Sequence, residues 1–244
     1  MLSFLNKEIV ITGATSGIGK AGAISIAGKG GSVIATGRSR LTELEEALPS
    51  GCRVIYNDAS SADTGTELAS SLKKGKTLDG LWLNAGWASI GDITEITATD
   101  FDAIMAANLR GPVLQLAALA PYLKDGASVV VTASTSAYEG AAATSLYAAS
   151  KAALIALTRC WATELGTRGI RVNTLVPGPI ATNFRHFMSD EFRHDFEASV
   201  GERLALERVG NAQEAANVAL FLLSDAASYV TGSQYAVDGG LSLR

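Results

Sequence analysis

The sequence is poor in cysteine and in positive charge, and each shortage excludes a class of protein. Only two cysteines, Cys52 and Cys160, occur among 244 residues, which is too few for a disulfide framework and favours a reducing compartment. There are 20 lysine and arginine residues against 24 aspartate and glutamate residues, for a net charge of −4. No basic stripe is therefore expected to neutralise nucleic-acid phosphates. No apolar stretch is expected to reach the roughly 18–20 residues of a membrane span, and the first residues lack a signal-type apolar core. We expect a cytoplasmic protein with neither a nucleic-acid nor a membrane partner.

Motifs for hydrolysis and for metal binding are missing as well. No G-x-S-x-G nucleophile elbow occurs in the chain, which argues against the commonest serine hydrolases. The only histidines, His186 and His194, lie eight residues apart with no cysteine near them. This spacing is poor for a metal site, so we predict no metal.

The sequence does have a regular alternation of short apolar runs and amphipathic stretches. Near-continuous hydrophobicity is typical of strands buried on both faces of a parallel sheet, and strand–helix alternation implies a doubly wound sheet. We predict one α/β domain over residues 1–244, with about seven parallel strands and helices on both faces. The irregular segment 183–209 is expected to form a substrate lid or insert. The predicted strands are 8–12, 32–36, 52–56, 79–83, 127–133, 170–175 and 234–238, and the predicted helices are 17–29, 40–48, 62–74, 99–122, 145–166 and 211–223.

Residues 12–21, TGATSGIGKA, suggest one of two phosphate loops. A nucleotide-hydrolysing P-loop requires G-x-x-x-x-G-K-[ST]. Here Gly13 lies one residue too far from Gly19, and Ala21 provides no hydroxyl for magnesium. A dinucleotide-binding turn fits better, because Gly13 can take a positive φ, Gly17 lets the backbone approach a pyrophosphate and Gly19 lets helix and strand pack closely. The free N–H groups of the following helix would bind the pyrophosphate. Taken alone, these residues also fit a plain tight turn.

The end of the second predicted strand bears on the type of cofactor. A site specific for NAD expects Asp or Glu there, to hold the ribose 2′-hydroxyl. The sequence instead reads Gly37-Arg38-Ser39-Arg40, with no carboxylate before Glu43. A guanidinium at this position can bind a 2′-phosphate in bidentate geometry. The pattern favours NADP(H) over NAD(H), the alternative being a surface arginine in a loop.

Tyr147 and Lys151 form the only Tyr-x-x-x-Lys in the chain and share one face of a predicted helix. An ammonium about 4 Å from a phenolate is worth about 4 kcal/mol at an effective dielectric constant of ~20, or ~3 pKa units. That would bring a phenol of pKa ~10 close to neutrality, where proton transfer is most effective. Ser134 follows strand 127–133 at the edge where open α/β sheets bind ligands. An isolated pair of this kind is more often an ordinary helix-surface pair.

Two asparagines add polar groups to this part of the fold. Asn84-Ala85-Gly86 ends the strand before Ser134, and so reaches the same sheet edge. Asn108 lies inside the apolar helix 99–122, where asparagine lowers helix propensity. It is either a satisfied core amide or an anchor for a water molecule.

Together these residues resemble the classical short-chain dehydrogenase/reductase family, in its 3-oxoacyl-carrier-protein-reductase-like branch, over essentially the whole chain. The resemblance implies a Rossmann fold. The joint spacing of the motifs is far more specific than any one of them. The motifs are Thr12-Gly13-x-x-x-Gly17-Ile18-Gly19, Asp58-Ala59, Asn84-Ala85-Gly86, Asn108, Ser134, Tyr147-x-x-x-Lys151, Pro177-Gly178-Pro179-Ile180 and Thr231-Gly232…Val237-Asp238-Gly239-Gly240.

The resemblance implies a role for each motif. Tyr147 would be the general acid/base, Lys151 would lower its pKa and bind the nicotinamide ribose, Ser134 would orient the carbonyl, and Asn108 would hold the water of a proton relay. Arg38 matches the 2′-phosphate reader, although the basic residue that some NADP-dependent members carry before the second motif glycine is here Ser16. The remaining cofactor contacts would be Gly13, Ser16, Gly17, Ile18 and Gly19 at the pyrophosphate, Asp58 and Ala59 at the adenine, Asn84, Ala85 and Gly86 at the adjoining ribose region, and Pro177, Gly178, Ile180 and Thr182 near the nicotinamide.

The resulting expectation is an NADP(H)-dependent carbonyl reductase or alcohol dehydrogenase acting on a small molecule. Trp87, Tyr138 and Phe184 are the candidates to line an apolar substrate pocket. No basic patch for docking an acyl carrier protein is evident, and the resemblance implies a homotetramer formed through 99–122 and 145–166. Two rival functions are a non-catalytic NADP(H)-sensing module and a Rossmann-like methyltransferase. The Tyr–Lys pair counts against both, because neither needs a proton donor there.

Overall fold

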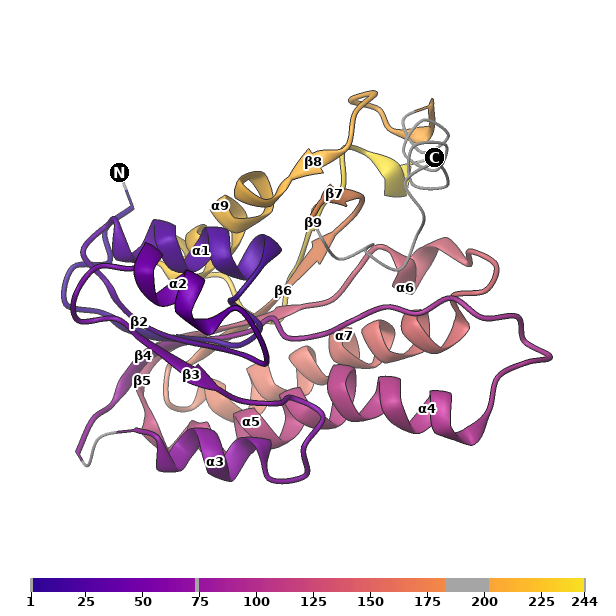
Figure 1. The fold of residues 1–244 in the computed structure, drawn as a ribbon. Helices are drawn as coiled ribbons and strands as arrows, with labels where there is room; N and C mark the ends of the chain where they lie inside the picture. The colour runs from indigo at the N-terminus through magenta and orange to yellow at the C-terminus, as the bar shows by residue number, and fades with distance from the viewer. Residues whose placement is uncertain (1, 73–74, 183–201, 244) are drawn as a thin grey trace.

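A seven-stranded, wholly parallel sheet forms the centre of the computed structural model, which describes residues 2–72, 75–182 and 202–243 (Figure 1). The strand order is β3-β2-β1-β4-β5-β6-β9. The chain therefore starts in the middle of the sheet, and the order reverses between β1 and β4, which in doubly wound folds is where a ligand binds. The strands are β1 Glu8–Ile11, β2 Ser32–Gly37, β3 Arg53–Tyr56, β4 Leu78–Leu83, β5 Leu123–Thr132, β6 Arg171–Pro177 and β9 Gln234–Val237.

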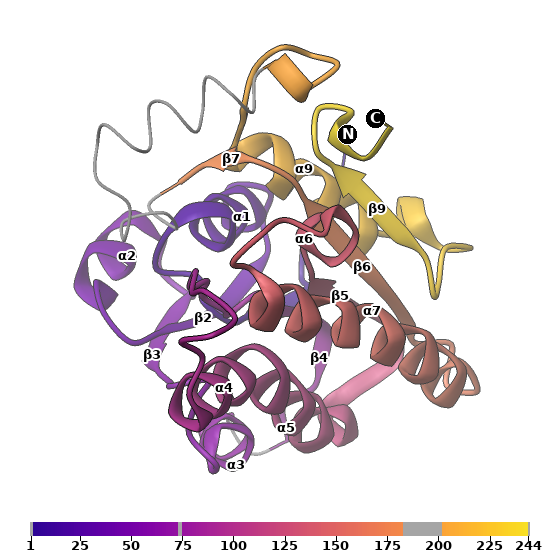
Figure 2. The same cartoon turned by 90° about the vertical axis from the view of Figure 1, so that its right-hand side faces the viewer.

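Helices cover both faces of the sheet, as Figures 1 and 2 show. One face carries α1 Gly17–Ala27, α2 Leu41–Ala47 and α9 Ala212–Leu223, and the other carries α3 Thr64–Ser70, α4 Ala98–Met105, α5 Gly111–Leu119 and α7 Ser145–Gly166. Successive side chains of a strand point to opposite faces, so Ile9 and Ile11 enter the core under α1 and α9, while Val10 enters the core under α5 and α7. The predicted fold class, its seven strands and its helices on both faces are confirmed.

The expected helix 99–122 is in fact four consecutive pieces. A π-helical turn, η1 Ala106–Arg110, separates α4 from α5, and a 3₁₀ turn, η2 Ala120–Tyr122, follows α5. Elements not predicted from the sequence are the short helix α6 Ser136–Glu139, a small sheet of β7 Ile180–Ala181 and β8 Gly210–Asn211, and the 3₁₀ turns η4 Asp225–Ala227 and η5 Leu241–Leu243.

The helical run Ala98–Tyr122 is long and apolar enough, by length and composition alone, to cross a membrane. This corrects the expectation that no apolar stretch reaches this length, because polar residues scattered along the run conceal its high mean hydropathy. In the fold the run is a core element. Its side chains Ile104, Leu116 and Leu119 are buried, and α5 packs along α3. Burial of one face accounts for its apolar composition.

Candidate active site

The glycine loop between β1 and α1 has the geometry of a phosphate cradle. Gly13 and Gly17 have positive φ values of 63° and 52°. A Cβ at Gly13 would lie 2.7 Å from the Cα of Ala85, and one at Gly19 would lie 2.5 Å from the carbonyl oxygen of Gly13, so both positions require glycine. No side chain caps the start of α1 at Ser16, and its first turn carries no acidic residue. These features fit a bound pyrophosphate, since the first N–H groups of a helix need an acceptor.

Hydrogen bonds join the carboxyl ends of β1, β4 and β5 beneath this loop. The hydroxyl of Thr12 accepts hydrogen bonds from the backbone N–H groups of Asn84 (3.0 Å) and Ala85 (3.1 Å). The Asn84 side chain donates to the Gly13 carbonyl (3.0 Å) and accepts from the Thr132 hydroxyl (3.1 Å). The amide of Asn84 thus holds the glycine loop in place, and only the backbone of this motif is left to meet a cofactor.

Tyr147 and Lys151 lie one turn apart on α7, and both are buried, with 8% and 2% of their surface exposed. The Nζ of Lys151 lies 5.8 Å from the centroid of the Tyr147 ring and donates a 3.0 Å hydrogen bond to the carbonyl of Thr132. Burial lowers the pKa of Lys151 to about 8, so most of the amine is still charged at neutral pH. A positive charge this close to the ring favours the phenolate form of Tyr147 over the neutral phenol.

Asn108 lies in the π turn and is fully buried beside this pair. Its side chain accepts from the N–H of Trp87 (2.9 Å) and donates to the Trp87 carbonyl (2.8 Å) and to the Ser150 hydroxyl (3.2 Å). A Cβ at Gly86 would lie 3.1 Å from both the Asn108 Oδ1 and the Lys151 Nζ. Asn108 is therefore a satisfied amide that also adjoins the ammonium, and π turns are frequent at functional sites.

Ser134 follows β5 and is 9% exposed. Its hydroxyl oxygen accepts from the backbone N–H of Ser136 (3.2 Å), and the two serine hydroxyls are 3.3 Å apart. The backbone N–H of Thr135 donates to the Pro177 carbonyl (3.0 Å), which joins this turn to the end of β6. The turn holds the Ser134 hydroxyl at the carboxyl edge of the sheet, the edge that Tyr147 and Lys151 also approach.

Arg38 and Asp58 lie side by side where β2 and β3 end. The Arg38 side chain is 60% exposed, and its Nη1 lies 4.0 Å from the Asp58 Oδ1. Asp58 also accepts hydrogen bonds from the N–H (2.9 Å) and hydroxyl (2.8 Å) of Ser60. Partial burial raises the pKa of Asp58, but the hydrogen bonds from Ser60 and the charge of Arg38 outweigh it and leave the pKa below its usual value. The carboxylate therefore stays ionised and faces the guanidinium.

Three other predicted contact residues follow the end of β6. Thr182 lies against the phosphate cradle, since a Cβ at Gly17 would lie 3.3 Å from the Thr182 Cγ2. Ile180 is buried in β7. The Gly178 backbone packs so closely on Asp238 that a Cβ there would lie 2.7 Å from the Asp238 Cα.

The three predicted substrate contacts differ in their surroundings. Trp87 is partly buried and is held through its backbone by Asn108. Tyr138 lies on α6 and is 54% exposed, and its hydroxyl donates to the Gln234 side chain of β9. Partial burial raises the pKa of Tyr138, although the charge of Arg159 opposes the shift. Phe184 lies outside the described residues.

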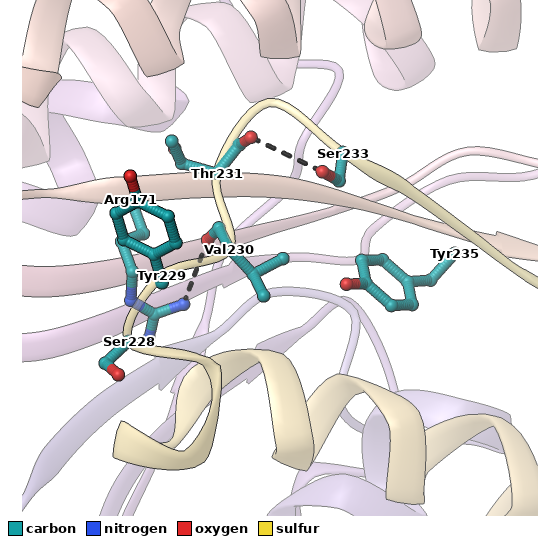
Figure 3. A pocket seen from close by; sticks show the side chains of 7 residues that line it. All are labelled: Arg171, Ser228, Tyr229, Val230, Thr231, Ser233 and Tyr235. Atoms are coloured by element: carbon teal, nitrogen blue, oxygen red, sulfur yellow. Dashed lines mark hydrogen bonds between the residues drawn. The ribbon is translucent and has the colours of Figure 1, made fainter.

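A cavity of about 370 Å³ lies at the opposite end of the strands, where β6 and β9 begin (Figure 3). Arg171 at its wall donates to the carbonyls of Leu222 (2.9 Å), Ser224 (3.0 Å) and Val230 (3.4 Å). Its guanidinium is thereby committed to holding the end of α9 and the following loop. The residues that line this cavity are Arg171, Ser228, Tyr229, Val230, Thr231, Ser233 and Tyr235.

No group of three or more potential metal ligands occurs in the described part of the chain.

Comparison with known proteins places the chain in a family. The family model described as Enoyl-(Acyl carrier protein) reductase matches residues 13–242. The chain is 35% identical to 3-oxoacyl-acyl-carrier-protein reductase FabG of Thermotoga maritima, covering 96% of this chain and 97% of that protein. It is also 35% identical to L-xylulose reductase of Caenorhabditis elegans, with 98% and 97% covered. The chain belongs to the short-chain dehydrogenase/reductase family.

Solved structures of short-chain dehydrogenases agree with this assignment. The glucose/ribitol dehydrogenase-type member from Brucella melitensis superposes with a TM-score of 0.92 at 32% identity, over 98% of both chains. A blue fluorescent protein from a metagenomic library, solved with NADPH, superposes with a TM-score of 0.88 at 30% identity, over 98% of this chain and 99% of that one. The chain is thus a hydride-transferring oxidoreductase of a family that binds a nicotinamide cofactor and acts on small molecules.

Within this short-chain dehydrogenase, Thr132 is a site residue that the sequence analysis did not single out. Its carbonyl holds Lys151, and its hydroxyl accepts from the Trp82 indole (2.9 Å) and donates to Asn84. The available signal was a threonine at the end of a buried apolar strand, where parallel strands present their ligand-binding edge.

Proposed function

We propose that the protein is an NADP(H)-dependent oxidoreductase that transfers a hydride between nicotinamide and a carbonyl or secondary alcohol of a small molecule, with Tyr147 as general acid/base. The burial of Lys151 beside Tyr147 carries the proposal, because the ammonium forms no ion pair with a carboxylate among the described residues and its charge faces the tyrosine ring. Asn108 lies beside the ammonium across Gly86, and Ser134 follows β5 at the same edge of the sheet.

In the reducing direction, a nicotinamide cofactor held by the glycine loop and Lys151 would supply the hydride for the carbonyl carbon. The Tyr147 hydroxyl protonates the carbonyl oxygen, and the Lys151 ammonium stabilises the phenolate that this leaves. The Ser134 hydroxyl, held by its own turn, donates to the same oxygen and fixes its position. Asn108 holds the backbone of Trp87 beside the ammonium, and we assign it to hold the water molecule of a proton relay that returns a proton through Lys151.

The preference for NADP(H) rests on Arg38. It is exposed at the end of β2, where a ribose 2′-substituent lies in doubly wound dinucleotide sites, and Asp58 holds it at 4.0 Å. The 2′-phosphate would replace this long ion pair with charge-assisted hydrogen bonds.

Nucleotide titration tests this proposal. We expect wild-type protein to bind NADPH more tightly than NADH, as followed by nicotinamide fluorescence. Arg38→Ala should remove about 10- to 100-fold of that preference, the value of a charge-assisted contact. Lys124→Ala is the control, because it removes an exposed cation that is paired with Asp79 at the opposite edge. If wild type binds neither nucleotide, the proposal falls. A preference for NADH would leave the oxidoreductase assignment unchanged. It would show that Arg38 is a surface residue that does not bind a 2′-phosphate.

We also propose a cytoplasmic, single-domain protein that assembles as a homotetramer through α4–α5 and α7. The exposed Phe101 on α4 supports this assembly, as does the alanine-rich sequence of α7, since small residues allow helices to pack closely. Light scattering after gel filtration measures the mass directly, and a monomer of 25.2 kDa would contradict it.

A further inference from the structure

One face of the helical run α4–η1–α5 reaches two different loops at the carboxyl edge of the sheet. Asn108, Gly111 and Gln115 are spaced three and four residues apart, and all three are buried. Residues at this spacing share a helix face. Asn108 holds the loop after β4 through Trp87, whereas Gly111 and Gln115 meet the loop after β3.

The contact with the loop after β3 is made backbone to backbone. A Cβ at Gly111 would lie 2.2 Å from the carbonyl oxygen of Ala59, and a Cβ at Gly65 of α3 would lie 2.2 Å from the carbonyl oxygen of Leu114. The Arg110 guanidinium also donates to the carbonyl of Ser60 (2.6 Å). Segment 58–65 therefore approaches α5 closely through its backbone at both Ala59 and Gly65.

Gln115 adds a buried polar cluster to this contact. Its Nε2 donates to the Asn57 Oδ1 and to the Thr64 hydroxyl, both at 3.0 Å. Thr64 in turn donates to the Asn57 Oδ1 (2.8 Å), and the Asn57 amide donates to the Thr64 carbonyl (3.0 Å). All three residues are at most 4% exposed. The Gln115 Oε1 has no hydrogen-bond partner among the described residues, so the cluster costs more than an apolar residue of similar shape would.

Asn57 connects this cluster to the predicted cofactor contacts. It immediately precedes Asp58 and Ala59, and its backbone N–H donates to the carbonyl of Gly37 (3.1 Å), the residue before Arg38. A shift of Asn57 would therefore displace the ends of both β2 and β3. The other face of the cluster is α5, which continues from the π turn that holds Asn108.

We propose that Gln115 is a positioning residue for the adenosine half of the dinucleotide. It holds Asn57, and through Asn57 it sets the spacing between Arg38 and the Asp58–Ala59 turn. This rests on the proposed function, because it assumes that these residues meet the adenosine 2′-phosphate end of NADP(H). The energetic cost of the buried amide is offset by a binding surface that is ordered before the nucleotide arrives.

Gln115→Met tests the proposal, because methionine keeps the length of the side chain and removes both donors. The probe is adenosine 2′,5′-bisphosphate, which contains the adenosine end and lacks nicotinamide, titrated calorimetrically against the full-length protein. We expect its Kd and the Kd of NADPH to rise about five-fold, the effect of losing one or two neutral hydrogen bonds. The kcat at saturating NADPH should stay within about two-fold, because the nicotinamide end is untouched.

Two further variants separate positioning from stability. Asn173→Ala is the matched control, since it removes a buried amide that holds the Val230 carbonyl (2.7 Å) and the Ser233 N–H (3.1 Å) far from this cluster. It should lower stability and leave the Kd of the bisphosphate unchanged. Thr64→Val is the gentler variant if Gln115→Met does not fold, and it should raise that Kd about two-fold or more.

The outcomes distinguish this proposal from the proposed function. Wild type that binds the bisphosphate, with an unchanged Kd in Gln115→Met or in its substitute Thr64→Val, overturns the positioning role alone. An equal rise in Kd for Asn173→Ala also overturns it, because the effect would then follow stability. Wild type that binds neither the bisphosphate nor NADPH overturns the proposed function and this proposal with it.

Discussion

The sheet carries a buried cation at each end, and the two are held in opposite ways. Lys151, 2% exposed at the carboxyl edge, donates to one carbonyl, that of Thr132. Arg171, 9% exposed at the amino edge, donates to the carbonyls of Leu222 and Ser224 and to that of Val230, the last of which Figure 3 shows. Burial lowers the pKa of both groups, and for Arg171 the charge of Asp225 partly offsets the shift.

The difference separates a cation that holds the structure together from one that we propose takes part in the chemistry. The guanidinium N–H groups of Arg171 already donate to carbonyl groups at and beyond the end of α9. A ligand in the adjoining cavity would have to replace these hydrogen bonds. Lys151 forms no ion pair with any carboxylate in the described part of the chain, and its charge faces a tyrosine ring at 5.8 Å. A perturbed cation in an undersatisfied setting is the better candidate for function.

The largest expected effect concerns the Lys151 side of this comparison. Lys151→Met should lower kcat by about 10²- to 10⁴-fold, as for loss of a general acid/base, when turnover is followed by nicotinamide absorbance with a panel of ketones. Tyr147→Phe should cost a similar factor, and the double variant should cost little more, because groups that act as a unit are not additive. If the loss of kcat in the double variant equals the product of the two single losses, the lysine does not act through the tyrosine.

Substitution of Arg171 is expected to lower the stability of the protein and to leave its activity unchanged. Arg171→Met leaves the Leu222, Ser224 and Val230 carbonyls without their donor, so the free energy of unfolding should fall by about 3 kcal/mol. Denaturant unfolding measures this. Arg168→Met is the control, since its arginine also donates to carbonyls but is partly exposed and should cost about 1 kcal/mol. A selective loss of kcat in Arg171→Met at normal stability would erase the contrast between the two cations.

The smallest expected effect is a pH dependence that only Lys151 produces. Its pKa is about 8 in the folded protein against a usual value of 10.5, so between these pH values the unfolded chain binds more protons than the folded one. Stability contributed by this group therefore rises as pH increases from about 8 towards 10.5. The gap in unfolding free energy between wild type and Lys151→Met should shift in favour of wild type by on the order of 2 kcal/mol over this range. A gap independent of pH would mean that the buried amine titrates normally.

The strands and most helices were predictable from the sequence, because strands buried on both faces leave apolar runs that no surface element imitates. All seven predicted strands and the helix Ser145–Gly166 are confirmed. The break of helix 99–122 at the π turn was not predictable. The sequence Ala106–Arg110 suits an α-helix as well, and the break accompanies contacts of Asn108 and Gly111 with distant loops.

The candidate site divides in the same way. Glycines at a strand–helix turn and the Tyr147–Lys151 spacing are local signals, and the structure places these groups at one edge of the sheet. Side-chain partners that lie far apart in the sequence could not be predicted from it. Gln115 is a single polar residue in the run GPVLQLAAL, which signals a buried amide, but its partner Asn57 is 58 residues away in the chain. Arg171 likewise gave no sign that its partners would be carbonyl groups rather than a carboxylate or a ligand.

The strand order also determines when during synthesis the phosphate loop can take shape. Residues 12–19 leave the ribosome early, yet the loop closes against Ala85 and the Asn84 side chain, which in turn needs Thr132. At roughly 5–20 residues per second, the glycine loop waits several seconds or more for these partners to emerge. A nascent chain that stops before Thr132 therefore contains the residues of the glycine loop but lacks the contacts that fix the loop in its nucleotide-binding conformation. The loop therefore takes its binding shape only after the strands that carry Asn84 and Thr132 have joined β1.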